Sequence, residues 1–198
     1  VHGVQWSMPS TKDIALSTAI ILPAETPGTV LFQENFEDKK PLPFTFIEKG
    51  NWKQKTDETG NQVYEIVNLT GTGYPQIRFG SPAWENYTIE YRTRMLDSTS
   101  ALSDVFCTFR SQQRGWYIQT LHPPDSVFLL YHVPSPQSDE ALGTGPMSVV
   151  KGIWYSVRIE ARDAQLRVFL DNNLVVETTD SRASQGDITL GVGPGLQA

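Results

Sequence analysis

Cysteine and histidine are scarce in this sequence. Of its 198 residues, one is Cys and three are His. The single thiol of Cys107 excludes an internal disulfide and a metal site made of several thiolates. The string FCTF around Cys107 predicts a small buried side chain at this position. Three scattered His residues without a His-Glu-x-x-His pattern do not make a zinc site.

Long apolar runs and clusters of positive charge are also missing. The longest apolar candidate, Ile14 to Leu22, is short and is interrupted by Ser17 and Thr18, so we expect no membrane insertion. The net charge of -6 comes from scattered carboxylates, and the basic residues form no stripe with interleaved aromatic side chains. Nucleic acid is therefore not an expected partner, because binding to phosphates requires clustered Lys and Arg.

Convincing amphipathic helix patterns are absent, and alternation with a period of two takes their place. It is clearest in residues 152–180, GIWYSVRIEARDAQLRVFLDNNLVVETTD. Apolar and polar residues alternate from Trp154 to Ala161 and again from Leu166 to Leu170, with turns at Asp163 and at residues 171–173. This pattern predicts three consecutive antiparallel strands.

Similar short strands are expected along most of the chain. Residues 1–29 have no clear period and are expected to form a linker or stalk, or to add one edge strand. Residues 134–146 are rich in Pro, Ser and Gly and predict a polar loop. About a dozen short strands without an internal repeat are typical of a sandwich of two antiparallel sheets, with a small barrel as the alternative. The other expected strands are residues 30–32, 51–56, 62–67, 76–79, 87–95, 105–111, 115–121, 127–133, 147–150 and 186–192.

The order of these strands resembles a known superfamily. An apolar strand into LFQENF is followed by Trp52, and then by SPAWENYTIEYRTRM, CTFRSQQRGWYIQTL, the stretch of residues 152–180 and GDITLGVG. Residues 30–198 look like the concanavalin A-like lectin/glucanase superfamily in its laminin-G-like bacterial branch. The resemblance implies an all-β, two-sheet antiparallel jelly-roll β-sandwich (concanavalin A-like) in a secreted or cell-surface protein.

Catalytic patterns are weak or missing. Retaining glycosidases, which the superfamily includes, need two carboxylates about 5 Å apart. The nearest acidic grouping, Glu34 to Asp38, lies at a strand end with the wrong spacing for one strand face. The sequence has neither a Gly-x-Ser-x-Gly elbow nor a phosphate-binding glycine loop. A glycosidase or a sugar-acting lyase is therefore the alternative, and a domain without catalysis is the main expectation.

Polar side chains on the long strands are the candidate ligand-binding residues. Arg92 and Arg94 belong to one strand, Arg110 to the next together with the polar Thr108, and Tyr117 and Gln119 to the one after. If these strands are neighbours, the side chains line one sheet face, where rings can stack on sugars and planar polar groups can bind hydroxyls. Arginine would add affinity for acidic sugars. A solvated sheet face carries the same residue types without a ligand, and a register slip of one residue would turn Tyr117 into the core.

Two further residues complete the candidates. The superfamily includes a bacterial branch named for acting on 3-keto sugars, and His122 is the only His in a suitable position for it, although a loop His beside two prolines is the plainer interpretation. Many members hold Ca²⁺ between the first and last strands, and Glu34 is the carboxylate that this resemblance implies, with a surface Glu as the alternative. Trp116, beside Gly115, is expected to be more exposed than Trp residues that pack in the sandwich.

The sequence thus predicts a monomeric extracellular β-sandwich that binds a carbohydrate without catalysis, as a module of a larger protein. A glycoside hydrolase or lyase acting on a polysaccharide is one alternative, and a structural or protein-interaction laminin-G-like domain is another. The only expected cofactor is a structural Ca²⁺.

Overall fold

The computed structural model describes residues 19–23, 29–37, 43–47, 51–67, 73–98, 104–122, 126–134, 137–146, 148, 150–193 and 196–197. Within these residues every regular element is a β-strand, and every strand pair is antiparallel. None of the described residues belongs to a helix long and apolar enough to cross a membrane.

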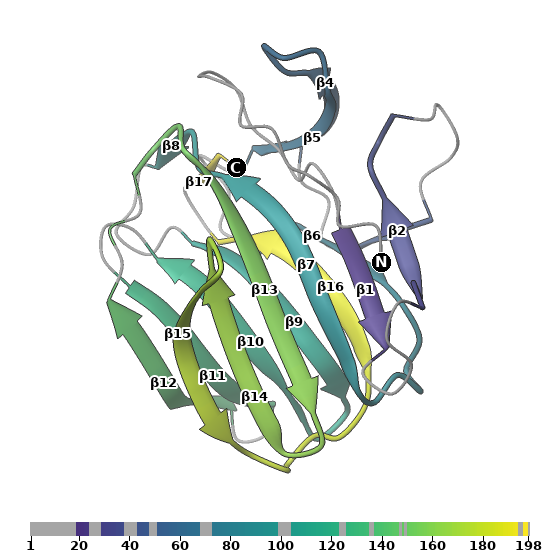
Figure 1. The fold of residues 1–198 in the computed structure, drawn as a ribbon, viewed down its shortest axis with the longest axis vertical. Helices are drawn as coiled ribbons and strands as arrows, with labels where there is room; N and C mark the ends of the chain where they lie inside the picture. Colours follow the sequence, from purple (N-terminus) through teal and green to yellow (C-terminus); the bar gives the residue numbers. More distant parts are fainter. Residues whose placement is uncertain are drawn as a thin grey trace.

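Two large sheets face each other and form the sandwich, with the six-stranded sheet in front in Figure 1. The six-stranded sheet has the order β15-β14-β13-β7-β1-β2. Its strands are β1 (Ala19–Pro23), β2 (Phe32–Glu34), β7 (Tyr87–Arg94), β13 (Trp154–Arg162), β14 (Gln165–Leu170) and β15 (Asn173–Thr179).

The second sheet has seven strands in the order β12-β11-β10-β9-β16-β6-β3. Its strands are β3 (Thr45–Ile47), β6 (Gln76–Phe79), β9 (Val105–Gln112), β10 (Gly115–His122), β11 (Ser126–Pro134), β12 (Gln137–Pro146) and β16 (Asp187–Val192). A small third sheet lies at one end of the sandwich, with the order β4-β5-β17-β8 (Figure 1). It consists of β4 (Asn51–Thr56), β5 (Gln62–Val67), β8 (Asp97–Ser98) and β17 (Leu196–Gln197).

The predicted three-strand meander is confirmed as β13-β14-β15. Arg162 pairs with Gln165, and Leu170 pairs with Asn173, so both connections are two-residue turns. Asp171 and Asn172 have φ angles of 46° and 67°, as a type I′ hairpin turn requires. The Asx residues of the sequence therefore set the register of this half of the front sheet.

The segment expected to be a linker or an edge addition contains an internal strand. β1 pairs with β7 on one side and with β2 on the other. The chain before the expected domain start at residue 30 therefore contributes the strand next to the edge of the six-stranded sheet, between β7 and β2. Residues 14–18 of the stretch Ile14 to Leu22 lie outside the described residues.

The polar loop predicted for residues 134–146 is wrong, because most of this segment is β12. It pairs with β11 from Pro134–Gln137 to Ser126–Pro146 and forms an edge of the seven-stranded sheet. An edge strand with mostly exposed side chains needs no apolar alternation, which is why composition misled the prediction. Gly143 of β12 lies close to Val176 of β15: a Cβ built on Gly143 would be 2.5 Å from the Cγ1 atom of Val176. β12 therefore closes one side of the sandwich against the six-stranded sheet.

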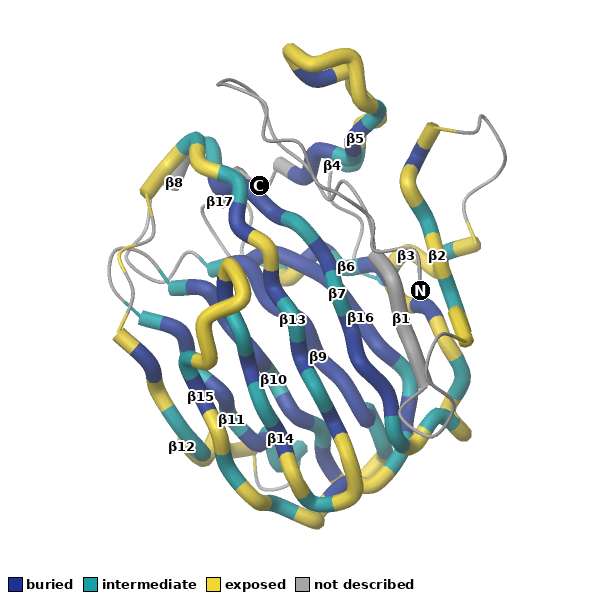
Figure 2. Tube along the Cα trace, in the orientation of Figure 1, coloured by how far each residue is buried: buried dark blue, intermediate teal, exposed yellow. Residues whose placement is uncertain are grey.

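The hydrophobic core lies between the two large sheets. The inward side chains of β7 include Tyr87, Ile89 and Tyr91, each at most 2% exposed, and they belong to the same cluster as Cys107 of the opposite sheet. Figure 2 shows the resulting bands of buried and partly exposed residues along β13 and β14. The core therefore occupies the inner faces and leaves the two outer faces for other roles.

Candidate functional site

A groove of about 580 Å³ crosses the outer face of the seven-stranded sheet. It extends from β12 and β11 across β10, β9 and β16 to β6 and β3, so it spans the whole sheet. Its lining combines aromatic, hydroxyl, amide and charged side chains with a few aliphatic ones. The lining residues are Ile47, Tyr74, Gln76, Arg78, Asp104, Phe106, Thr108, Ser111, Trp116, Ile118, Thr120, Leu130, His132, Gln137, Asp139 and Thr189.

An aromatic row stands at one end of the groove. The register places Trp116 of β10 opposite His132 of β11, and His132 opposite Asp139 of β12. The Trp116 and His132 rings stack with their centroids 4.3 Å apart, and His132 Nδ1 lies 2.6 Å from Asp139 Oδ1. Cross-strand pairing therefore builds a platform whose indole is held in place by an imidazole and a carboxylate.

A second exposed aromatic residue lies toward the other end. Tyr74, just before β6, is 49% exposed and meets the edge of the Phe106 ring, with a centroid separation of 6.2 Å. Asp104, just before β9, lines the same region. Burial raises the pKa of the Asp104 carboxyl to about 7. Hydrogen bonds from the backbone N–H groups of Asp104 and Gly193 act in the opposite direction and lower this pKa, because they favour the charged form.

Polar groups occupy the middle of the groove. The hydroxyls of Thr108 and Thr189 hydrogen-bond to each other across β9 and β16. Arg78 Nε lies 3.5 Å from Asp187 Oδ2. Burial raises the pKa of Asp187, and the charge of Arg78 opposes that shift. The buried Asp187 Oδ1 has no hydrogen-bond partner.

Arg110, a predicted ligand-binding residue, is instead a structural residue inside the protein. Its side chain has no exposed surface, and it donates hydrogen bonds to the backbone carbonyls of Glu85 (2.9 and 3.1 Å), Asp163 (2.6 Å) and Ala183 (3.3 Å) and to Asn86 Oδ1 (3.2 Å). Consecutive residues of a regular strand face opposite sides, yet Phe109 and Arg110 are both buried. A β-bulge, with a φ angle of 51° at Arg110, turns the Arg110 side chain inward.

Tyr117 and Gln119 also face the core rather than a ligand. Both are fully buried; Tyr117 Oη donates to Asp180 Oδ1 at 2.7 Å, and Tyr91 Oη donates to Gln119 Oε1 at 2.6 Å. Burial raises the pKa of the Tyr117 hydroxyl far above its usual range. The register of β10 is therefore the one in which Trp116 points outward.

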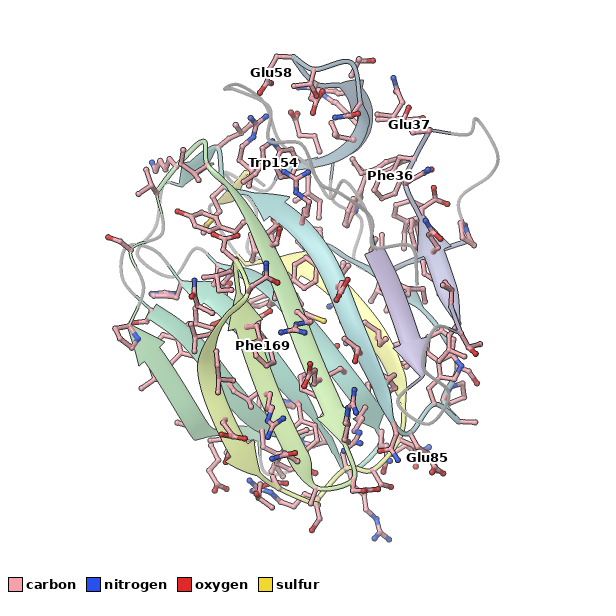
Figure 3. The ribbon with its side chains drawn as sticks, in the orientation of Figure 1. Phe36, Glu37, Glu58, Glu85, Trp154 and Phe169 are labelled. Atoms are coloured by element: carbon pink, nitrogen blue, oxygen red, sulfur yellow. The ribbon has the colours of Figure 1, made fainter. Side chains whose placement is uncertain are left out.

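Arg92 and Arg94 lie on the outer face of the other sheet. The Arg92 and Arg94 guanidinium carbons lie 5.2 and 4.8 Å from the centre of the Trp154 ring. Arg94 is fully buried and pairs with Glu58 at 3.3 Å, so it ties β7 to the turn between β4 and β5. Glu58 is labelled at the top of Figure 3. The Arg94 Nε and Nη2 atoms have no hydrogen-bond partner.

His122 is the one predicted ligand-binding residue of the six that lies on the outer face of the seven-stranded sheet. It ends β10 on the same side as Trp116, and its ring meets the edge of Phe128 with a centroid separation of 6.0 Å. It lies beyond the residues that line the groove. The expectation that Arg92, Arg94, Arg110, Tyr117 and Gln119 share one ligand-facing surface is wrong.

The residues that do line the groove are only partly visible in the sequence. The alternation of its strand places Thr108 on the polar side, and the neighbouring Gly115 favours an exposed Trp116; both line the groove. In β10, however, the side chains of residues 116, 118 and 120 (Trp, Ile, Thr) alternate with those of residues 117, 119 and 121 (Tyr, Gln, Leu). Both sets contain two apolar or aromatic residues and one polar residue, so polarity does not show which set faces the core. The row of Trp116, His132 and Asp139 depends on the pairing of three strands, for which no local sequence pattern exists.

Glu34, the predicted metal ligand, lies on β2. Its Oε1 accepts a hydrogen bond from the backbone N–H of Phe36 at 2.6 Å. Across the described ranges, no group of three or more His, Cys, Asp and Glu side chains is arranged to hold a metal ion. A calcium ion at Glu34 would therefore depend mainly on backbone carbonyl oxygens, which Ca²⁺ accepts as ligands.

Comparisons with known proteins identify the fold. No protein-family model and no curated protein sequence matches the chain. Among solved structures, a carbohydrate-binding module (CBM66) from Bacillus subtilis matches with a TM-score of 0.60 and 17% identity over 79% of this chain and 91% of that chain.

Two enzymes are also similar in structure. Crh5 transglycosylase in complex with NAG has a TM-score of 0.57 and 11% identity over 95% of this chain and 73% of that chain. An alginate lyase (AlgAT5) of polysaccharide lyase family 7 has a TM-score of 0.51 and 12% identity over 90% of this chain and 83% of that chain. The chain thus has the predicted fold, an antiparallel jelly-roll β-sandwich of the concanavalin A-like type.

Proposed function

We propose that the protein binds a carbohydrate in the groove of the seven-stranded sheet and does not cleave it. The observation that carries this proposal is the composition of the groove, in which Trp116 and Tyr74 flank a floor of hydroxyl and amide side chains. Aromatic faces pack on the apolar faces of sugar rings, and side chains such as Thr108 and Gln76 can exchange hydrogen bonds with sugar hydroxyls. The structural similarity to a carbohydrate-binding module supports the same function.

A glycan array probed with the wild-type protein and with Trp116→Ala tests this function. We expect the wild type to bind a defined set of glycans and Trp116→Ala to bind them at least about tenfold more weakly, because a central aromatic contact is lost. Phe169→Ala is the matched control, because Phe169 packs under Arg158 on the outer face of the opposite sheet (Figure 3). Absence of glycan binding by the wild type would refute the proposal.

A polysaccharide hydrolase or lyase is the second candidate, and Asp104 is the residue that favours it. A carboxyl group with a pKa of about 7 in a groove is suited to donate and accept protons near neutral pH. Two of the similar structures are a transglycosylase and a lyase. Incubation of the purified protein with array-positive polysaccharides, followed by a reducing-end assay and absorbance at 235 nm, should detect no turnover; turnover that Asp104→Asn abolishes would establish the enzyme instead.

Several finer features belong to the same proposal. The laminin-G-like branch, an extracellular or cell-surface location and a monomeric state are consistent with a glycan-binding module of a larger protein, and they stay predictions. A structural Ca²⁺ at Glu34 also stays a prediction. A rise in melting temperature on addition of CaCl₂, reversed by EGTA and absent in Glu34→Gln, would support it.

A further inference from the structure

The charges of the groove differ from those that the sequence suggested. Arg92 and Arg94 lie on the other sheet, and Arg110 is buried among backbone carbonyls. Among the described residues that line the groove, the only arginine is Arg78, and no lysine is present. Arg78 is already paired with Asp187.

Carboxylates outnumber cations in the same lining. Asp104 lies near Tyr74 at one end, and Asp139, with a 54% exposed side chain, lies beside His132 at the other. Between these two ends, the carboxylate of Asp187 offsets the charge of Arg78. Asp187 lies directly across from Ser111 in the register of β16 and β9. Above about pH 7, where the Asp104 carboxyl is ionised, an anionic ligand would therefore meet negative charge at both ends, and in the middle a single arginine whose charge Asp187 offsets.

Resting on the proposed function, we propose that the groove selects neutral glycans and rejects glycans that carry uronate or sulfate groups. Recognition of carboxylate or sulfate groups in proteins depends on arginine forks or lysines that can give their hydrogen bonds to the ligand. In this groove the one arginine, Arg78, has its charge offset by Asp187, whose Oδ2 lies 3.5 Å from Arg78 Nε. Like charges at both ends add repulsion to the cost of stripping water from an anion.

The same groups suit the hydroxyls of a neutral glycan. Carboxylates such as Asp104 and Asp139 accept hydrogen bonds from hydroxyl groups, and Thr120 can both donate and accept. Ile118 and Leu130 provide apolar surface next to Trp116. Trp116 and the strand that follows Tyr74 are three strands apart, roughly 14 Å at the usual strand spacing, so the groove has room for more than one sugar ring.

Affinity gel electrophoresis tests this selectivity at pH 8 and low ionic strength, where charge repulsion is least screened. Neutral gels contain laminarin, galactomannan or xyloglucan, and anionic gels contain alginate, polygalacturonate or chondroitin sulfate. We expect retardation in at least one neutral gel and in none of the anionic gels. The inference would be overturned if an anionic gel retarded the wild type as strongly as the neutral gel and Trp116→Ala lost this retardation; glycan binding would then still stand. If no gel retarded the wild type, the proposed function would be refuted, and the inference with it.

Asp187→Asn provides a second measurement on the same gels. The substitution keeps the size of the side chain and removes the charge that offsets Arg78. We expect Asp187→Asn to be retarded by polygalacturonate at a concentration at least about tenfold below any that retards the wild type, the gain that a freed charge-assisted hydrogen bond gives. An unchanged affinity, in a variant with a wild-type melting curve, contradicts the role of Asp187 as the group that masks Arg78.

Discussion

Arg110 joins parts of the chain that are far apart in sequence. Its guanidinium donates to carbonyls that lie before β7, in the turn after β13 and before β16. Its backbone N–H donates to the hydroxyl of Tyr87 at 2.9 Å, and this hydroxyl is itself buried. The carbonyls of these three segments therefore satisfy a fully buried guanidinium, and Arg110 in turn gives the buried Ala183 carbonyl its donor.

We predict that Arg110→Ala lowers the free energy of unfolding by about 3 kcal/mol or more, because it removes several charged hydrogen bonds and a fully buried side chain at once. Urea denaturation followed by tryptophan fluorescence measures the change. Arg167→Ala is the control: Arg167 forms an ion pair with Glu177 at 2.7 Å near the surface, and its loss should cost less than about 1 kcal/mol. Equal losses for the two variants would contradict the structural role of Arg110.

Cys107 is the residue for which sequence and structure agree most simply. Its side chain is fully buried, and burial raises the pKa of its thiol far above the usual range. We predict that the folded protein does not react with DTNB at pH 8 over minutes, because the reactive thiolate is both scarce and inaccessible. One thiol per chain should react after unfolding in urea. Rapid labelling of the native protein would show that β9 is not packed as described.

Close backbone approaches fix how the elements of the seven-stranded sheet meet. Gly186 precedes β16 with a φ angle of 147°, and a Cβ at this position would collide with the backbone of Arg110 and Ser111. Its N–H donates to the carbonyl of Trp84 at 3.0 Å. Because β16 also carries Thr189, which lines the groove, the close packing of Gly186 helps to position part of the candidate site.

Gly186→Ala is predicted to destabilise the protein by about 2 kcal/mol or more, since both the backbone angle and the space disfavour a side chain. Gly60→Ala serves as the comparison. Gly60 has a φ angle of 93°, but nothing lies within 4 Å of the position that a Cβ would take, so only the angle should cost, about 1 kcal/mol. Chemical denaturation of both variants gives the difference, and a smaller loss for Gly186→Ala than for Gly60→Ala would contradict the close packing of β16 on β9.

Most elements can be predicted because their periodicity is local. The strands predicted at 51–56, 62–67 and 76–79 have their expected ends in the structure, since polar or glycine-containing sequence flanks each of them. β12 could not be predicted, because an exposed edge strand depends on the neighbouring β11 for its conformation. The inward turn of Arg110 depends on a bulge, and nothing in the alternation of β9 marks it.

For the whole molecule, Asp104 makes stability depend on pH. Its carboxyl has a pKa of 3.8 in its ordinary state and about 7 in the folded protein, because burial disfavours the charge. Below pH 3.8 the group is protonated in both the folded and the unfolded chain and has no effect. As the pH rises toward 7, the unfolded chain gives up the proton first, so this group destabilises the fold increasingly and reaches its full effect above about pH 7.

We predict that Asp104→Asn removes this loss. Relative to the wild type, the variant should gain about 2–4 kcal/mol in free energy of unfolding between pH 4 and pH 8, as a shift of this size implies. Urea denaturation at several pH values provides the comparison. A difference between the two proteins that stays constant across this range would show that the carboxyl is not buried.

The groove as a whole is a property of the assembled sheet. The sequence indicates a β-sandwich and a sugar-binding sheet face, but it assigns that face to arginines that the fold uses elsewhere. Trp116, His132 and Asp139 come together only when β10, β11 and β12 pair in register. The proposed binding surface therefore follows from strand order, which a single sequence encodes only indirectly.

The most direct test of the central claim is to locate the bound glycan by NMR. The chain has five tryptophans, and their indole N–H signals can be assigned by Trp→Phe substitution. Titration with the strongest array-positive oligosaccharide should shift the indole signal of Trp116 and the amide signals around Thr108 and Thr189, and leave the indole of Trp154 on the opposite sheet unchanged. Shifts confined to Trp154 and its neighbours, with Trp116 unaffected, would contradict binding in the groove.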